Sequence, residues 1–158
     1  MTPAAAVVPR SGPRCWPRPS RLRYTCRVDD AVVQALRQAL AGRDDVRLAV
    51  LFGSTARRTA GPASDVDVAV LGRRLDILAL ARDLTRAVGR EVQIVALEAV
   101  SYPMLQAIVR DGIVVAEHER GCAARWRSRA LVDLDNDRAW FERMRDAYLR
   151  HLAADRPA

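Results

Sequence analysis

Two aspartates and a glycine–serine pair stand at a defined spacing in the first half of the chain. In the stretch LFGSTARRTAGPASDVDVAVL, residues 51–71, Gly53 and Ser54 are followed by ten residues and then by Asp65 and Asp67. Aspartates two positions apart on a strand project from the same face, about 7 Å apart along the backbone, so their carboxylates can converge on a shared cation. Hard oxygen ligands of this kind suit Mg²⁺, whose coordination is normally completed by water and substrate phosphates.

The Gly53–Ser54 pair lies where a predicted strand turns into a short helix. Backbone amides at such a turn can point at a phosphate, and a helix N-terminus favours its negative charge. A phosphate site beside a metal site would explain why two carboxylates stand in an apolar run, where an unpaired buried charge is costly. Each signal alone is weak, because Gly-Ser turns are common and Asp-Val-Asp on a half-exposed strand is often simply solvated. Their combination on a strand, a turn and a second strand favours the functional reading.

Apolar periodicity predicts the elements that position these side chains. A helix over residues 29–42 would start from Asp29 or Asp30 as N-cap, and a helix over 75–88 would end at Gly89. A third helix is predicted from Pro103 to Gly112, and one or two helical turns between Ser54 and Gly61. Strands are predicted over residues 46–52, 65–71, 91–97 and 113–117.

From Cys122 onward the pattern is helical and more charged. Trp140, Met144, Tyr148 and Leu152 recur every fourth residue and form a narrow apolar stripe. We expect this stripe to pack back on its own domain, with docking onto a partner as the alternative. The predicted organisation is therefore a Pro- and Arg-rich leader over residues 1–27, a folded domain over 28–118 and a helical extension over 119–158.

Charge and composition exclude several classes of function. The net charge is +7, but residues 1–27 carry six arginines and no acid, so nearly all of the excess belongs to the leader. We therefore expect the leader to be disordered and the folded part to bind no nucleic acid directly. All 26 basic residues are arginine, which excludes a Schiff-base lysine and a Walker-A lysine.

The remaining composition favours a cytoplasmic protein. The cysteines, Cys15, Cys26 and Cys122, are odd in number and lack C-x-x-C spacing, so neither a disulfide framework nor a zinc site is indicated. No apolar run approaches the roughly 18 residues of a membrane span, and we expect no membrane association. With 158 residues the chain has room for one folded domain plus a small appendage.

The order G-S, ten residues, D-x-D, placed at Gly53, Ser54, Asp65 and Asp67, resembles the nucleotidyltransferase fold of the DNA polymerase beta superfamily. Within it, the chain is most similar to the minimal nucleotidyltransferases of MntA type, which act as antitoxins beside HEPN-domain toxins. The resemblance covers about residues 29–118. It implies an α/β (α+β) architecture, with a small, twisted, mixed sheet flanked by helices and followed by the helical C-terminal extension. It also implies ATP as substrate, Mg²⁺ as cofactor, and transfer of AMP to a tyrosine hydroxyl of a HepT-type HEPN ribonuclease.

By that resemblance Gly53 and Ser54 would hold the triphosphate, and Asp65 and Asp67 would bind metal and be catalytic. Arg57 stands where the family often has a basic residue and would touch phosphate, with a solvated arginine as the alternative. The chain departs from the family at Gln93, where relatives usually carry a third carboxylate. Glu91, two residues earlier on the same predicted strand, is a possible substitute, and a solvated strand-entry residue is the alternative.

Three functions follow from these residues. The first is an adenylyltransferase antitoxin that modifies and silences a HEPN ribonuclease, with activity weakened by Gln93. The second is a binding module with a degraded nucleotide site that neutralises its partner by contact. The third is nucleotide transfer to a small molecule such as an aminoglycoside, because an acceptor pocket leaves no signature in the sequence.

Overall fold

The structure, a computed structural model, describes residues 29–61 and 63–154, so the leader lies outside the described residues. The side chains of residues 29 and 30 also lie outside the description, which leaves the expected N-cap unplaced. In chain order the elements are α1 (Asp29–Leu40), β1 (Val46–Phe52), α2 (Gly53–Ala56), β2 (Val66–Gly72), α3 (Ile77–Val88), β3 (Val92–Ala96), α4 (Tyr102–Asp111), β4 (Ile113–Glu117) and α5 (Cys122–Ala154).

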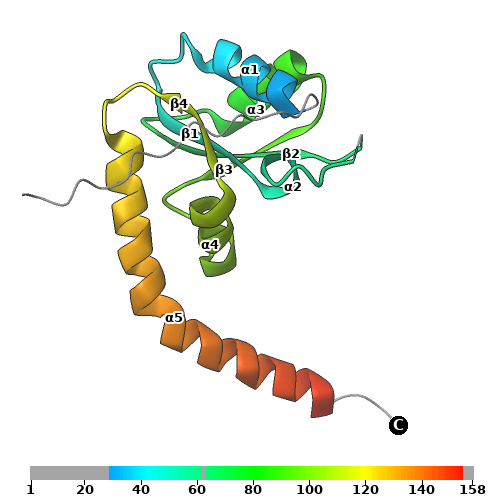
Figure 1. The fold of residues 1–158 in the computed structure, drawn as a ribbon, viewed down its shortest axis with the longest axis vertical. Coiled ribbons are helices and arrows are strands. Elements are labelled where there is room, and N and C mark those ends of the chain that lie inside the picture. Colours follow the sequence, from blue (N-terminus) through cyan, green and yellow to red (C-terminus); the bar gives the residue numbers. More distant parts are fainter. Residues whose placement is uncertain (1–28, 62, 155–158) are drawn as a thin grey trace, which may run out of the picture.

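The four strands form one mixed sheet with the order β3-β2-β1-β4. The central pair β1–β2 is antiparallel, β4 joins β1 antiparallel, and β3 joins β2 parallel. Helices flank this sheet and the long α5 follows it (Figure 1). The predicted mixed sheet with flanking helices and a helical C-terminal extension is therefore confirmed.

Strands β1 and β4 have the predicted bounds, whereas other element boundaries differ by one or two residues. Helix α3 begins at Ile77 rather than at residue 75, because the side chain of Asp76 accepts a hydrogen bond from the Ala79 amide at 2.9 Å and caps the helix. Its end is as predicted, with Gly89 in the left-handed conformation at φ 73°. Strand β2 begins at Val66, so Asp65 lies one residue before the strand in which it was predicted.

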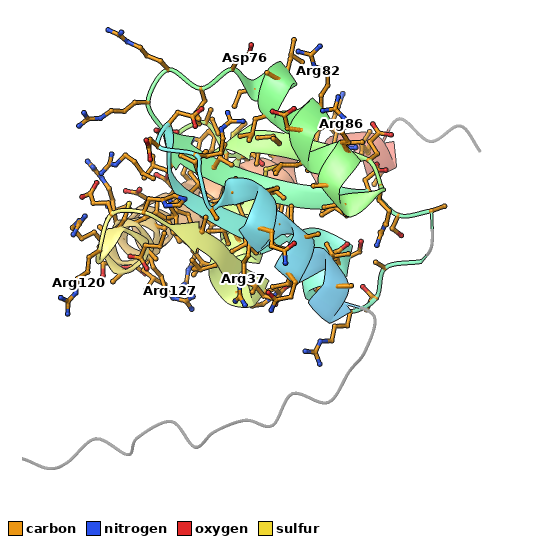
Figure 2. The ribbon with its side chains drawn as sticks, turned by 90° about the horizontal axis from the view of Figure 1, so that it is seen from above. Arg37, Asp76, Arg82, Arg86, Arg120 and Arg127 are labelled. Carbon is orange, nitrogen blue, oxygen red and sulfur yellow. The ribbon has the colours of Figure 1, made fainter. Side chains whose placement is uncertain are left out.

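Helices α1 and α3 cover one face of the sheet and lie side by side, as Figure 2 shows from above. The leucines that they turn inward are fully buried: Leu36, Leu40, Leu80 and Leu84. Each such burial stabilises the fold by about 1.5–3 kcal/mol relative to an exposed side chain. Val66, Val68 and Val70 of β2 pack into this core. Residues between them on β2 consequently face the opposite side of the sheet.

Helix α4 and the first half of α5 cover that opposite face. Their core contains apolar residues of three strands together with Ile108 and Cys122. On β2 this face carries Asp67, Ala69 and Leu71 in succession. Ala69 is buried under the helices, whereas Asp67 stands at the end of the face where β2 begins.

The prediction that the C-terminal stripe packs on its own domain is wrong. Helix α5 has 33 residues and is about 50 Å long, so it extends well past the domain (Figure 1). The last aromatic contact with α4 is the stack of Phe141 on Tyr102, with ring centroids 4.4 Å apart. Every residue from 142 to 154 is exposed. The periodicity identified an apolar face correctly, but the domain ends before that face does.

The surface arginines of the described residues are dispersed. Arg37 stands on α1, Arg82 and Arg86 on α3, Arg120 before α5 and Arg127 on α5, and all five are exposed (Figure 2). In the described part of the chain, no helix is both long enough and apolar enough to cross a membrane.

Candidate active site

The turn from β1 into α2 requires glycine for two independent reasons. Gly53 has φ +73°, a left-handed conformation that side chains rarely adopt. A Cβ atom at this position would also lie 2.1 Å from Oδ2 of Asp67 and 3.0 Å from its Cγ. The backbone of Gly53 therefore lies directly against the Asp67 carboxylate, and two parts of the sequence motif meet in space.

Strand pairing fixes where Asp67 stands. It is opposite Phe52 in the antiparallel β1–β2 pair, one residue before Gly53. On its other side it is in register with Gln93 in the parallel β2–β3 pair. Asp67 is thus held between the end of β1 and the start of β3, and it cannot shift without moving the central strands.

The side chain of Asp65 is hydrogen-bonded to the side chain of Gln93. The Gln93 amide donates a hydrogen bond from Nε2 to Oδ2 of Asp65 at 2.8 Å. The backbone of Asp65 is also tied to α2, because the buried hydroxyl of Thr55 donates to the Asp65 carbonyl oxygen at 3.5 Å. Sequence reasoning did not single out Thr55. At 1% exposure it is the buried polar residue of the described part, but a lone threonine in a short polar segment gives no signal.

The surroundings of Asp67 disfavour its negative charge. Burial, and then the neighbouring Asp65 carboxylate, raise the pKa of Asp67, while Arg57 acts in the opposite direction. In the bare protein two like charges therefore stand together with partial burial and incomplete compensation. A cation in contact with both carboxylates would reverse this balance.

Arg57 lies at the C-terminal end of α2 and forms an ion pair with Asp111 at the end of α4, with Nη1 and Oδ2 3.7 Å apart. The guanidinium remains partly exposed, at 42% for its side chain, and is close enough to lower the pKa of Asp67. The long ion-pair distance and this exposure leave Arg57 able to turn towards a bound anion.

Ser54 follows Gly53 in α2, and its carbonyl oxygen accepts the amide of Thr59 at 2.9 Å, which closes the loop after the helix. Helix α2 has only four residues, so its contribution to anion binding would come from individual backbone amides more than from a helix dipole.

Glu91 is exposed just before β3, and its carbonyl oxygen accepts the Val66 amide at 2.9 Å. The described residues contain no cluster of three or more Asp, Glu, His or Cys side chains that could hold a metal ion. Two carboxylates are therefore what these residues offer a cation. Two carboxylates suit a Mg²⁺ ion whose coordination is completed by substrate phosphates. Because residue 53 is glycine, no side chain stands between the turn and the Asp67 carboxylate.

Comparison with known proteins gives the same fold. The family model of the polymerase beta nucleotidyltransferase domain matches residues 34–121. None of the curated proteins compared with the chain matches it.

Several solved structures are similar to the chain. A chain in a toxin–antitoxin structure with AMP-PNP is 21% identical, with TM-score 0.61, and the match covers 78% of this chain and 99% of that one. A chain in a structure of tri-AMPylated HEPN toxin from Shewanella oneidensis in complex with MNT antitoxin is 22% identical, with TM-score 0.56, and the match covers 77% and 95%. At such identities the likeness shows a shared fold.

Proposed function

The chain belongs to the polymerase beta nucleotidyltransferase family, and from this premise we propose that it is an MntA-type antitoxin that transfers AMP from ATP to a tyrosine hydroxyl of a HEPN-domain toxin. The transfer would silence the toxin. Similarity to chains of toxin–antitoxin structures, one with AMP-PNP and one with an AMPylated HEPN toxin, supports this choice among family activities.

The observation that carries the proposal is the contact between Gly53 and Asp67. At Gly53 both the φ angle and the nearby Asp67 carboxylate disfavour a side chain, and the charge of Asp67 is disfavoured by burial and only partly compensated by Arg57, which is unfavourable for a purely structural feature. It is reasonable where a phosphate must approach the backbone while a cation bridges it to the carboxylate. We assign the triphosphate to Gly53 and Ser54, with Arg57 as a further contact.

In the proposed reaction the tyrosine oxygen of the toxin forms a bond to the α-phosphorus of ATP. The bond from that phosphorus to the oxygen bridging to the β-phosphate breaks, and pyrophosphate leaves. Asp65 and Asp67 would hold Mg²⁺, which when bound neutralises charge on the transferring group and the leaving group. The phenolic proton passes to a carboxylate of the pair or to water.

Gln93 makes this reaction slow in the proposed mechanism. An amide oxygen can face a metal ion, but a neutral amide cannot accept the phenolic proton at neutral pH. Its present hydrogen bond uses the amide nitrogen as donor to Asp65, which holds that carboxylate in place. Gln93 would therefore position Asp65 without acting as a base.

The same residue favours one competing function, a binding module with a degraded site. Only two carboxylates gather here among the described residues, and the third position is uncharged. Such a module would neutralise its partner by contact alone. The two functions differ in whether the partner becomes covalently modified.

Incubation of a HEPN-domain toxin with the full-length chain, ATP and Mg²⁺, followed by intact-mass analysis, tests the proposal. We expect mass increments of one or more AMP groups, absent with EDTA and absent when the toxin tyrosine is changed to phenylalanine. A toxin that is bound and inhibited while its mass stays unchanged would support the binding module instead.

A further inference from the structure

Asp65 stands just outside the regular part of the sheet. Strand β2 and its pairing with β3 both begin at Val66, so the strand ladder does not hold Asp65, although the proposed site needs its carboxylate beside that of Asp67. The residues before it form a surface turn, in which the Ser64 hydroxyl oxygen accepts the amide of the exposed Gly61 at 2.9 Å. Contacts other than strand pairing therefore have to fix the main chain at Asp65.

The guanidinium of Arg90 makes such a contact. It donates hydrogen bonds from Nε, at 3.1 Å, and from Nη2 to the carbonyl oxygen of Ser64, 26 residues earlier in the chain. Hydrogen bonds from a charged donor are stronger than those between neutral groups. Because this carbonyl belongs to the peptide unit that joins Ser64 to Asp65, Arg90 holds the main chain directly before the metal-binding carboxylate of the proposed site.

The main chain around Arg90 is itself well anchored. Gly89 ends α3 in the left-handed conformation, and its amide donates to the Thr85 carbonyl oxygen at 2.8 Å. Two residues after Arg90, the amide of the buried Val92 donates to the Thr85 hydroxyl at 3.0 Å. The chain on both sides of Arg90 is thus tied to the last turn of α3, and the guanidinium reaches Ser64 from a fixed origin.

Two further hydrogen bonds join the same two segments. The Val66 amide donates to the Glu91 carbonyl oxygen at 2.9 Å, and the Gln93 amide donates to the Asp65 carboxylate at 2.8 Å. Residues 90, 91 and 93 therefore hold the chain before, after and at Asp65. Gln93 orients the carboxylate, whereas Arg90 fixes the main chain that carries it. Groups that orient a metal ligand in this way strengthen the binding of the metal.

We propose that Arg90 is a positioning residue for the cation bound by Asp65 and Asp67. This inference rests on the proposed function, because it takes Mg²⁺ with ATP as the ligand of the carboxylate pair. Loss of the positive charge of Arg90 alone would strengthen the binding of a cation. Loss of its hydrogen bonds lets Asp65 move and weakens that binding. The two effects have opposite signs, so the direction of the change tests the role of the hydrogen bonds.

Binding of the fluorescent ATP analogue mant-ATP to the full-length chain, titrated with Mg²⁺, tests the proposal. We expect Arg90→Met to raise the Mg²⁺ concentration for half-maximal binding about three- to tenfold, at the low end of what loss of a group bonded directly to a metal ligand causes. At saturating Mg²⁺ the dissociation constant of mant-ATP should stay within about twofold of wild type, because the proposed phosphate contacts at Gly53 and Ser54 are unchanged. Arg90→Lys keeps a charged donor for the Ser64 carbonyl oxygen and should recover most of the wild-type response.

Arg86→Met is the matched control. It removes the same charge from α3, where the exposed Arg86 pairs with Asp83 at 3.8 Å, and it should leave the Mg²⁺ response unchanged. Hydrogen exchange supplies a second measurement, without nucleotide or metal. The Val66 amide should exchange faster in Arg90→Met than in wild type or in Arg86→Met, because the segment before it is no longer held. Circular dichroism of each variant confirms that the fold is kept.

Four results overturn the proposal. The first is a wild-type Mg²⁺ response in Arg90→Met, and the second is a binding defect in Arg90→Met that persists at saturating Mg²⁺. The third is an Arg90→Lys variant as weak as Arg90→Met, and the fourth is unchanged exchange at Val66. If the wild-type chain itself binds no mant-ATP in Mg²⁺, the proposed function fails and the role of Arg90 fails with it. Mg²⁺-dependent binding by wild type that Arg90→Met leaves intact rejects the role of Arg90 alone.

Discussion

The carboxylates at the two ends of the central strand pair β1–β2 differ in whether an arginine neutralises them. Where β1 begins, Arg43 donates two hydrogen bonds to Asp45, each 2.8 Å long. Nearby, Arg47 forms an ion pair with Glu119, with Nη2 and Oε2 2.6 Å apart. These guanidinium groups lower the pKa of both carboxyls. The acids at this end are satisfied by the protein itself.

Where β1 ends, no arginine among the described residues donates a hydrogen bond to Asp65 or Asp67. Asp65 accepts a hydrogen bond from the neutral amide of Gln93, and the pKa of Asp67 is raised by burial and by Asp65. Arg57 opposes that shift from a distance while it pairs with Asp111. The acids at the start of β1 are paired with arginines, whereas the charge of Asp67 at the end of β1 is only partly compensated. We infer that a cation bound together with a ligand supplies the missing positive charge at this uncompensated end.

The largest effect is expected at the carboxylate pair. Asp65→Ala or Asp67→Ala should abolish AMP transfer, because a single carboxylate leaves the cation and the triphosphate poorly held. The fold should persist, since neither side chain supports the core. Asp45→Asn at the other end is the control and should keep transfer within about twofold of wild type. Transfer assayed by intact mass at a normal rate in either Ala variant would disprove the assignment.

Gly53→Ala should lower transfer strongly and stability moderately. The new Cβ meets the Asp67 carboxylate and the backbone is strained at φ +73°. Gly89→Ala is a matched control, because Gly89 has the same φ and no atom within 4 Å of an added Cβ. We expect about 1 kcal/mol of lost stability from strain alone at Gly89, and a greater loss at Gly53. Equal losses in urea unfolding would show that the Gly53–Asp67 contact is unimportant.

Gln93→Asp should raise the rate of AMP transfer at least about tenfold, because a carboxylate can accept the proton of the attacking hydroxyl. ATP affinity should change little, since Gly53 and Ser54 supply the proposed phosphate contacts. Gln93→Asn is the control that keeps the amide. If Gln93→Asp and wild type both bind ATP with Mg²⁺ and both leave the true partner unmodified, the binding-module function is the correct one.

The smallest effect is a pair of opposite changes in melting temperature. Because the pKa of Asp67 is raised in the folded chain, ionisation of Asp67 lowers the stability as the pH rises from near 4 through that raised pKa, and the loss is complete above it. Because the pKa of Asp45 is lowered, its charge contributes stability that is fully present above a pH near 4 and is lost as the pH falls through the lowered pKa. At pH 7 without ligands, Asp67→Asn should therefore raise the melting temperature and Asp45→Asn should lower it, each by about 1–3 °C. Both differences should shrink towards pH 3. Changes of the same sign would contradict the contrast between the two ends.

Much of the fold followed from local rules in the sequence. The predicted strand over residues 65–71 puts alternate residues on one face, and Val66, Val68 and Val70 lie together in the core opposite the aspartates. Gly89 ends α3 in the left-handed conformation, as predicted. These features depend on residues close together along the chain, so they can be predicted from the sequence alone. Likewise the spacing of Gly53 and Asp67 suggested one site, and strand pairing places the two in contact.

Features that depend on distant partners were beyond sequence reasoning. The ion pair of Arg57 with Asp111 and the burial of Thr55 join segments whose approach is fixed only by tertiary packing. The prediction that the apolar stripe on α5 packs on its own domain was wrong for the same reason. Periodicity shows that one face of a helix is apolar, but it does not show whether another part of the chain covers that face. The hydrogen bond from Gln93 to Asp65 requires the parallel β2–β3 register, which local pattern does not encode.

Thermal melting with and without Mg²⁺–ATP tests most directly whether the uncompensated end is a nucleotide–cation site. A ligand that binds only the folded chain raises its melting temperature, and the stabilisation grows with the logarithm of the ligand concentration divided by Kd. We predict a clear rise for wild type and for Asp45→Asn at millimolar Mg²⁺–ATP, no rise for Asp67→Asn, and loss of the wild-type rise when EDTA replaces Mg²⁺. An unchanged wild-type melting temperature, or an equal rise in Asp67→Asn, would contradict the site proposed at Gly53 and Asp67.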